Sequence, residues 1–92
     1  MPPALNSKTR SAMHTLSIHY YAALRDAAAC PQETVNTTSR TPLELYAELR
    51  TRHGFQYDVA DLKVAINDAF APMTAALAQG DTVVFIPPVS GG

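Results

Sequence analysis

Apolar and polar residues alternate through residues 14–21. Leu16, Ile18 and Tyr20 occupy every second position, with polar side chains between them. Because successive side chains of a strand point to opposite faces, this period of two predicts a half-buried strand. Tyr21 breaks the alternation, since it places an aromatic ring on the face that is otherwise polar.

Two further segments are expected to complete a hairpin with this strand. Residues 22–30 are rich in alanine and predict a short helix, which Pro31 ends. Residues 33–38 contain mainly threonine and valine, and these β-branched residues favour a second strand. We expect the second strand to pair with the first, with the short helix in the connection.

The main helix is predicted at residues 42–53. Thr41 is a good N-cap, Pro42 suits the first helical position, and Glu44 completes a capping box. A good N-cap stabilises a helix by about 1 kcal/mol. Gly54 follows the last turn, where glycine commonly ends a helix.

Short apolar segments and turns fill the second half of the chain. Residues 55–61 predict a loop, residues 63–67 a third strand and residues 69–70 a short fourth strand. Gln79-Gly80-Asp81 predicts a tight turn, which leads into a last apolar strand at residues 82–86.

The order of these elements predicts an α+β fold: a mixed sheet of about five strands with one main helix packed across it. This is the β-grasp, or ubiquitin-like, roll, in which the first and last strands are central, parallel neighbours. We divide the chain into a disordered N-terminal extension at 1–13, a β-grasp domain at 14–88 and a flexible Gly-Gly tail at 89–92. In a second interpretation, the natural chain starts at Met13.

Composition excludes several classes of function. The chain has 92 residues, of which 47% are apolar, and a formal net charge of −1, which argues against a nucleic-acid partner. Cys30 is the single cysteine, and no apolar run approaches the roughly 18 residues that span a membrane. The histidines do not converge, so we expect no metal site. No nucleophile–base pair or phosphate-binding loop occurs. We predict a cytoplasmic protein without an active site of its own.

The last residues are the strongest candidate for chemistry. Pro87 and Pro88 stop the final strand, and the sequence then ends on Ser90, Gly91 and Gly92. Glycine has no side chain, so such a tail fits a narrow active site of another protein. A free carboxylate becomes an electrophile once ATP converts it to an acyl-adenylate, and a sulfur donor then displaces AMP to leave a thiocarboxylate.

Four stretches resemble the small subunit of molybdopterin synthase, the MoaD type of ubiquitin-like sulfur carrier. The sequence Phe85-Ile-Pro-Pro-Val-Ser-Gly-Gly92 resembles the terminal signature of that family and is highly specific. The stretches 20–25, 64–67 and 79–81 resemble its first strand and short helix, its third strand and its last turn. The resemblance covers roughly residues 15–92.

The resemblance implies a function for the tail. An E1-like enzyme would use ATP to adenylate Gly92, and a sulfurtransferase system would convert it to a thiocarboxylate. Gly91 and Gly92 would then enter a MoaE-type large subunit of a heterotetramer and donate sulfur to cyclic pyranopterin monophosphate. No cofactor is expected to be bound by this chain.

A partner surface is predicted on the face of the sheet that the helix leaves open. If Val83 and Phe85 face the helix, the apolar side chains of Val84 and Ile86 point away from it, and exposed apolar clusters commonly mark interaction sites. A register shifted by one residue would bury these side chains instead. The predicted contact residues are Tyr21, Phe70, Val84, Ile86, Pro87, Pro88 and Val89.

Two other functions stay open at this point. One is a related β-grasp sulfur carrier or protein modifier that serves thiamine synthesis, cysteine synthesis or tRNA thiolation. The other is a non-catalytic binding module whose tail is incidental. Deletion of Gly91 and Gly92 would spare only the binding module.

Overall fold

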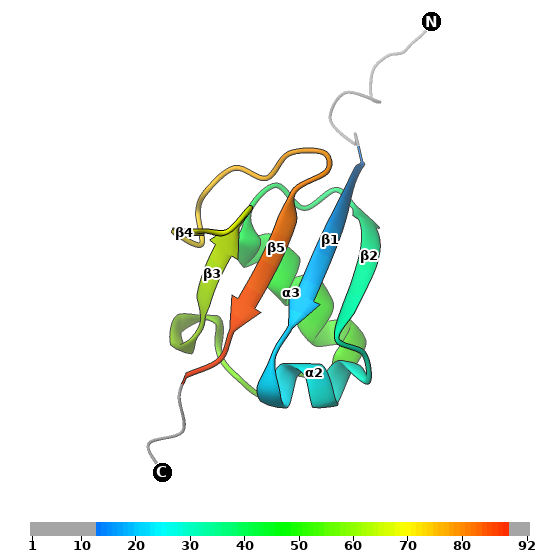
Figure 1. The fold of residues 1–92 in the computed structure, drawn as a ribbon, viewed down its shortest axis with the longest axis vertical. Helices are drawn as coiled ribbons and strands as arrows, with labels where there is room; N and C mark the ends of the chain where they lie inside the picture. Colours follow the sequence, from blue (N-terminus) through cyan, green and yellow to red (C-terminus); the bar gives the residue numbers. More distant parts are fainter. Residues whose placement is uncertain (1–12, 89–92) are drawn as a thin grey trace, which may run out of the picture.

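The computed structural model describes residues 13–88, which form one five-stranded sheet, two α-helices and a short 3-10 helix (Figure 1). The elements are β1 (His14–Tyr20), α2 (Ala22–Ala28), β2 (Gln32–Thr37), α3 (Pro42–His53), η1 (Val59–Asp61), β3 (Lys63–Ile66), β4 (Ala69–Ala71) and β5 (Thr82–Ile86). Residues 1–12 of the proposed extension and the tail at 89–92 lie outside the described residues.

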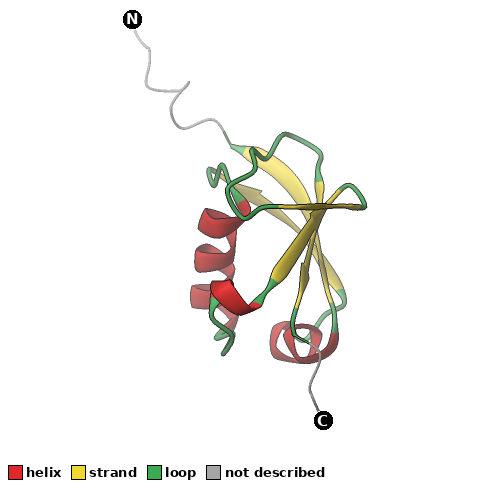
Figure 2. Cartoon of the chain, turned by 90° about the vertical axis from the view of Figure 1, so that its left-hand side faces the viewer, coloured by secondary structure: helices red, strands yellow, loops and turns green. Residues whose placement is uncertain are grey.

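The strand order β2-β1-β5-β3-β4 confirms the predicted β-grasp roll. Strands β1 and β5 are parallel neighbours, and every other pair in the sheet is antiparallel. Helix α3 lies along one face of the sheet, and no helix of residues 13–88 covers the other face (Figure 2). Helix α2 lies at the end of the sheet where β1 and β5 finish (Figure 1).

The core lies between the sheet and α3. The inward side chains of β1 and β5 are almost completely buried, as the period of two predicts, and Leu45, Tyr46 and Leu49 meet them from α3. The ring of Phe55 stacks on that of Tyr46, so the loop after α3 folds back against the core. The hydroxyl of Tyr46 donates to the carbonyl of Tyr57 at 2.8 Å, which fixes the same loop.

The bounds of α3 match the prediction from its capping residues. The N–H of Glu44 donates to the hydroxyl of Thr41 at 3.2 Å, and Gly54 ends the helix with a left-handed backbone at φ +74°. The carboxylate of Glu44, however, accepts from the N–H of Arg40 at 2.8 Å, one residue earlier than in a standard capping box.

Several other bounds were wrong by one or two residues. Strand β1 ends at Tyr20, because Tyr21 is the N-cap of α2. Helix α2 ends at Ala28, since Ala29 takes a left-handed conformation at φ 62° and its N–H returns to the carbonyl of Asp26. Strand β2 spans Gln32–Thr37, one residue closer to the N-terminus than the predicted 33–38.

The turn between β3 and β4 begins one residue earlier than predicted, so β3 is shorter than expected. Strand β3 ends at Ile66, because Asn67 and Asp68 both have positive φ angles, of 52° and 72°. Two successive positive φ angles are typical of a type I′ hairpin turn, which asparagine and aspartate tolerate. Strand β4 extends to Ala71, one residue beyond the expected end.

Candidate functional site

Strand β5 separates the core from an open face of the sheet. Val83 and Phe85 are 0% exposed and face α3, whereas Val84 and Ile86 are partly exposed on the opposite face. This alternation confirms the predicted register of the last strand and excludes the register shifted by one residue. We call the side of the sheet that faces away from α3 the outer face.

The strand register aligns apolar residues across the outer face. His19 of β1 pairs with Val84, Val84 pairs with Ala65 of β3, and Ala65 pairs with Phe70 of β4. Phe70 is 73% exposed, the largest exposure among the large apolar side chains of residues 13–88. The sequence prediction included Phe70 and Val84 but missed Ala65, whose alternation with Val64 would have indicated it.

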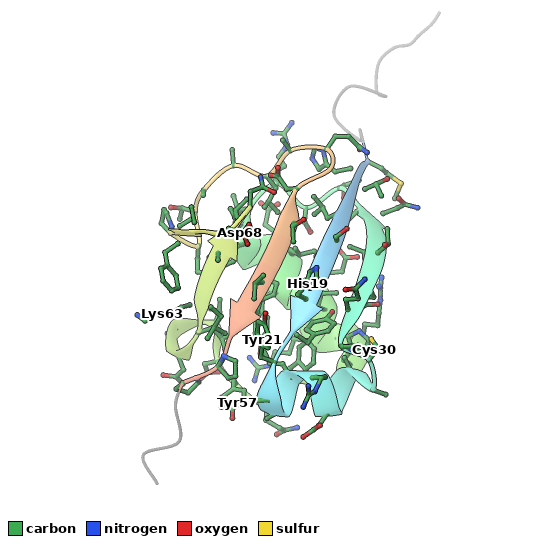
Figure 3. All side chains as sticks on the ribbon, viewed as in Figure 1. His19, Tyr21, Cys30, Tyr57, Lys63 and Asp68 are labelled. Carbon is green, nitrogen blue, oxygen red and sulfur yellow. The ribbon has the colours of Figure 1, made fainter. Side chains whose placement is uncertain are left out.

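Tyr21 joins this surface from a different position than expected. It is 53% exposed, but it precedes α2 instead of ending β1. Tyr20 of β1 pairs with Phe85 of β5, and these two strands are parallel. The residues that follow them in the sequence, Tyr21 and Ile86, therefore lie at the same end of the sheet. The exposed or partly exposed apolar residues of the outer face are Tyr21, Ala65, Phe70, Val84 and Ile86, which we call the apolar patch. Figure 3 shows Tyr21 close to the end of β5.

The prolines after β5 differ in exposure. Pro88 is exposed, in agreement with a role in contacting a partner, but Pro87 is buried. Pro87 is thus covered by the chain itself, and its predicted contact with a partner stays a prediction. Val89, Gly91 and Gly92 lie outside the described residues, and their predicted roles stay predictions.

A polar cluster lies at the edge of the core, at the same end of the sheet. The Glu33 carboxylate of β2 accepts from the hydroxyl of Tyr20, lies 2.6 Å from Nε2 of His53 in α3, and has a guanidinium nitrogen of Arg52 at 3.9 Å. The cluster thus joins both strands of the first hairpin to the last turn of α3.

The pKa values within the cluster are shifted by burial and by these contacts. Burial is the largest influence on Glu33 and raises its pKa, but the hydrogen bonds with Tyr20 and His53 together leave the pKa below the ordinary value of 4.5. Burial, followed by the hydrogen bond to Glu33, raises the pKa of Tyr20 well above its ordinary range. Glu33 is therefore a carboxylate and Tyr20 a neutral donor at neutral pH. Sequence reasoning missed the cluster, although Glu33 lies on the same face of β2 as the buried Val35.

Two kinds of feature are absent from the described part of the chain. Residues 13–88 contain no group of three or more His, Cys, Asp or Glu side chains that could hold a metal ion. Within the same residues, no helix has the length and apolar character needed to cross a membrane. Cys30 is a free cysteine that is partly buried against the core.

Comparison with known sequences gives consistent matches over nearly the whole chain. The model of the ThiS family matches residues 18–92. The molybdopterin synthase sulfur carrier subunit of Mycobacterium tuberculosis is 31% identical over 83 residues, which are 87% of this chain and 100% of that protein. The family match extends over the apolar patch.

Comparison with solved structures supports the fold. SAMP1 from Haloferax volcanii matches with a TM-score of 0.67 and 26% identity, covering 85% of this chain and 99% of that one. A chain in the complex of subunits 1 and 2 of molybdopterin-converting factor from Helicobacter pylori matches with a TM-score of 0.56 and 22% identity, covering 85% and 99%. At this lower identity, the likeness shows the fold alone.

Proposed function

This chain belongs to the ThiS family, and we propose that it is the sulfur-carrier small subunit of a molybdopterin synthase. The observation that carries the proposal is the match to the Mycobacterium tuberculosis sulfur carrier subunit along the whole length of that protein. The family match runs to Gly92, so it includes the tail on which a carrier depends.

The chemistry takes place on the C-terminal carboxylate. An E1-like enzyme binds ATP, the carboxylate of Gly92 attacks its α-phosphorus, and pyrophosphate leaves. A sulfur nucleophile then attacks the acyl carbon and AMP leaves, so that a thiocarboxylate remains. ATP belongs to the activating enzyme, and this chain supplies only the carboxylate and the surface that positions it.

The apolar patch is the surface we assign to the large subunit. It lies on the face of the sheet that α3 leaves open (Figure 2), and it includes Ile86, the last residue of β5. An uncovered apolar cluster of this kind is typical of a protein–protein interface. The Helicobacter pylori protein of the same fold forms a complex with a second subunit, which supports such a partner. In the complex, Gly92 delivers its sulfur to cyclic pyranopterin monophosphate, and two small subunits bind at the ends of a heterotetramer.

A second function is favoured by one similarity. The structure with 26% identity is the small archaeal modifier protein 1 of Haloferax volcanii. A modifier would use the same acyl-adenylate but transfer Gly92 to an amine of another protein. Incubation of the thiocarboxylated chain with purified large subunit and cyclic pyranopterin monophosphate distinguishes the two functions. Only a synthase subunit would convert this substrate to the dithiolene of molybdopterin.

Intact mass spectrometry after co-expression with the activating enzyme tests the proposal. We expect the mass of the chain to rise by the difference between one sulfur and one oxygen atom. A chain that lacks Gly91 and Gly92 is the control and should keep its mass. An unchanged mass of the full chain, under conditions that load a known carrier, would count against any sulfur-carrier role.

A further inference from the structure

A pocket of about 610 Å³ opens beside β3 because β4 ends early. The last pair between the two strands is Val64 with Ala71, and the next pair would place Pro72 opposite Lys63. Proline has no N–H to continue a ladder, so β4 stops there. The start of β3 is thus left uncovered on this side.

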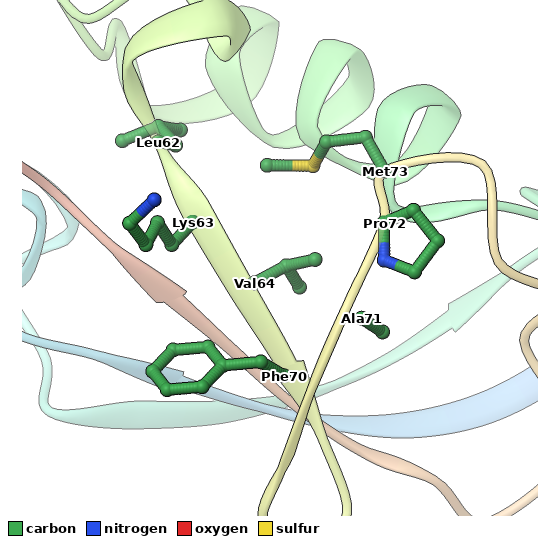
Figure 4. Close-up of a pocket in the computed structure, with 7 residues that line it drawn as sticks. All are labelled: Leu62, Lys63, Val64, Phe70, Ala71, Pro72 and Met73. Atoms are coloured by element: carbon green, nitrogen blue, oxygen red, sulfur yellow. The ribbon is translucent and has the colours of Figure 1, made fainter.

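The pocket combines an apolar interior with one cation at its rim. Leu62, Val64 and Met73 line it, and Figure 4 shows Lys63 and Phe70 extended to the same side of β3. Lys63 is exposed and is the single lysine of residues 13–88. It forms no ion pair with another residue in that range, and Asp68 lies at the opposite end of β3 (Figure 3).

Lys63 is also continuous with the apolar patch. It pairs with Ile86 across β3 and β5, so both side chains emerge on the outer face. Phe70 borders the pocket and belongs to the patch as well. A protein that covers Ile86 and Phe70 would therefore also cover part of Lys63 and displace some of the water around it.

We propose that Lys63 and this pocket select the partner: the docking segment of the large subunit carries a carboxylate that pairs with Lys63 and, beside it, an apolar side chain that enters the pocket. This inference rests on the proposed function, because it names the chemistry of the same interface. An ammonium group that is covered without a counter-charge is costly, so a partner without the carboxylate is rejected. Charge complementarity at the edge of an interface also speeds association.

Binding of purified large subunit to three charge variants tests the assignment. We expect Lys63→Gln to weaken binding roughly threefold to tenfold, as for a partly exposed ion pair, and Lys63→Glu to weaken it further. The loss should appear mainly in the association rate and should shrink as salt is raised. Arg40→Gln is the matched control. Arg40 lies outside the sheet, so this variant should bind the large subunit as tightly as the unsubstituted chain does.

A fourth variant tests the pocket. Met73→Gln keeps the length of the side chain but makes the wall polar, and we expect weaker binding with unchanged dependence on salt. Far-ultraviolet circular dichroism establishes that each variant is folded. If Met73→Gln binds as tightly as the unsubstituted chain, the part of the proposal that concerns the pocket is wrong.

The outcomes separate this inference from the proposed function. If the unsubstituted chain binds the large subunit and the Lys63 variants bind equally well, the inference is overturned and the proposed function stands. If the unsubstituted chain does not bind, the proposed function fails and the inference fails with it. A double-mutant cycle between Lys63→Gln and neutralised carboxylates of the large subunit should give coupling at one acidic residue.

Discussion

Replacing Glu33 should destabilise the domain through the cluster that it forms with Tyr20 and His53. The hydroxyl of Tyr20 is buried with its ring, which is 1% exposed, and donates to the Glu33 carboxylate. In Glu33→Ala this hydroxyl loses its acceptor, and a buried unsatisfied group costs about 1–3 kcal/mol. For a domain of this size, that loss lowers the melting temperature by roughly 10 °C.

Glu33→Gln provides a finer test of the charge. Glutamine keeps a carbonyl that can accept from Tyr20 but is neutral, and hydrogen bonds to neutral groups are weaker by about 1 kcal/mol than those to charged ones. Because the pKa of Glu33 is lowered in the folded chain, its stabilising effect is present above its ordinary value of 4.5 and is lost as the pH falls through the folded pKa. The difference in the free energy of unfolding between the unsubstituted chain and Glu33→Gln should therefore be smaller at about pH 3 than at about pH 7.

Urea denaturation at both pH values measures these free energies of unfolding. Asp26→Asn is the matched control, because Asp26 is exposed on α2 and should change the free energy by less than about 0.5 kcal/mol. The reasoning is refuted if Glu33→Ala is as stable as this control. It is also refuted if the gap for Glu33→Gln is the same at both pH values.

The remaining predictions concern the interface and the N-terminal residues. Ile86→Asp should weaken binding to the large subunit by roughly 2 kcal/mol, or about thirtyfold, as for a central contact residue, while the melting temperature changes little. The control is Thr34→Asp, which places the same charge on the outer face of the edge strand β2. An unfolded Ile86→Asp chain would show that Ile86 belongs to the core. Removal of residues 1–12 should leave both the melting temperature and thiocarboxylate formation unchanged, and a clear loss of either would place those residues within the working domain.

Local signals in the sequence predicted most of the fold. The bounds of α3 follow from Thr41, Pro42 and Gly54, which act on the helix ends directly. The outward direction of Val84 and Ile86 follows from the period of two, because β5 is buried on one face alone. Each of these signals depends on residues within a few positions of one another, which is the range over which a sequence pattern can be interpreted.

The features that sequence reasoning missed depend on contacts between distant segments. The pattern of β2 places Glu33 inward, but its partner His53 lies in α3, twenty positions further along. Burial of Pro87 likewise depends on what packs around the end of β5 and not on the two prolines themselves. The pocket beside Lys63 requires the register of β3 and β4, which fixes where Pro72 interrupts the pair.

The parallel pairing of β1 and β5 explains why Tyr21 and Ile86 of the apolar patch share one end of the sheet. Parallel strands finish at the same edge, so the residue after β1 and the last residue of β5 meet there, although Tyr21 and Ile86 are far apart in the sequence. If the two strands were antiparallel, Tyr21 would lie at the opposite end of the sheet from Ile86. β5 is also held on both sides, by β1 and by β3, which fixes Val84 and Ile86 relative to the rest of the sheet. Under the proposed function, a partner that binds the patch therefore contacts the last residue of β5, six positions before Gly92 in the sequence.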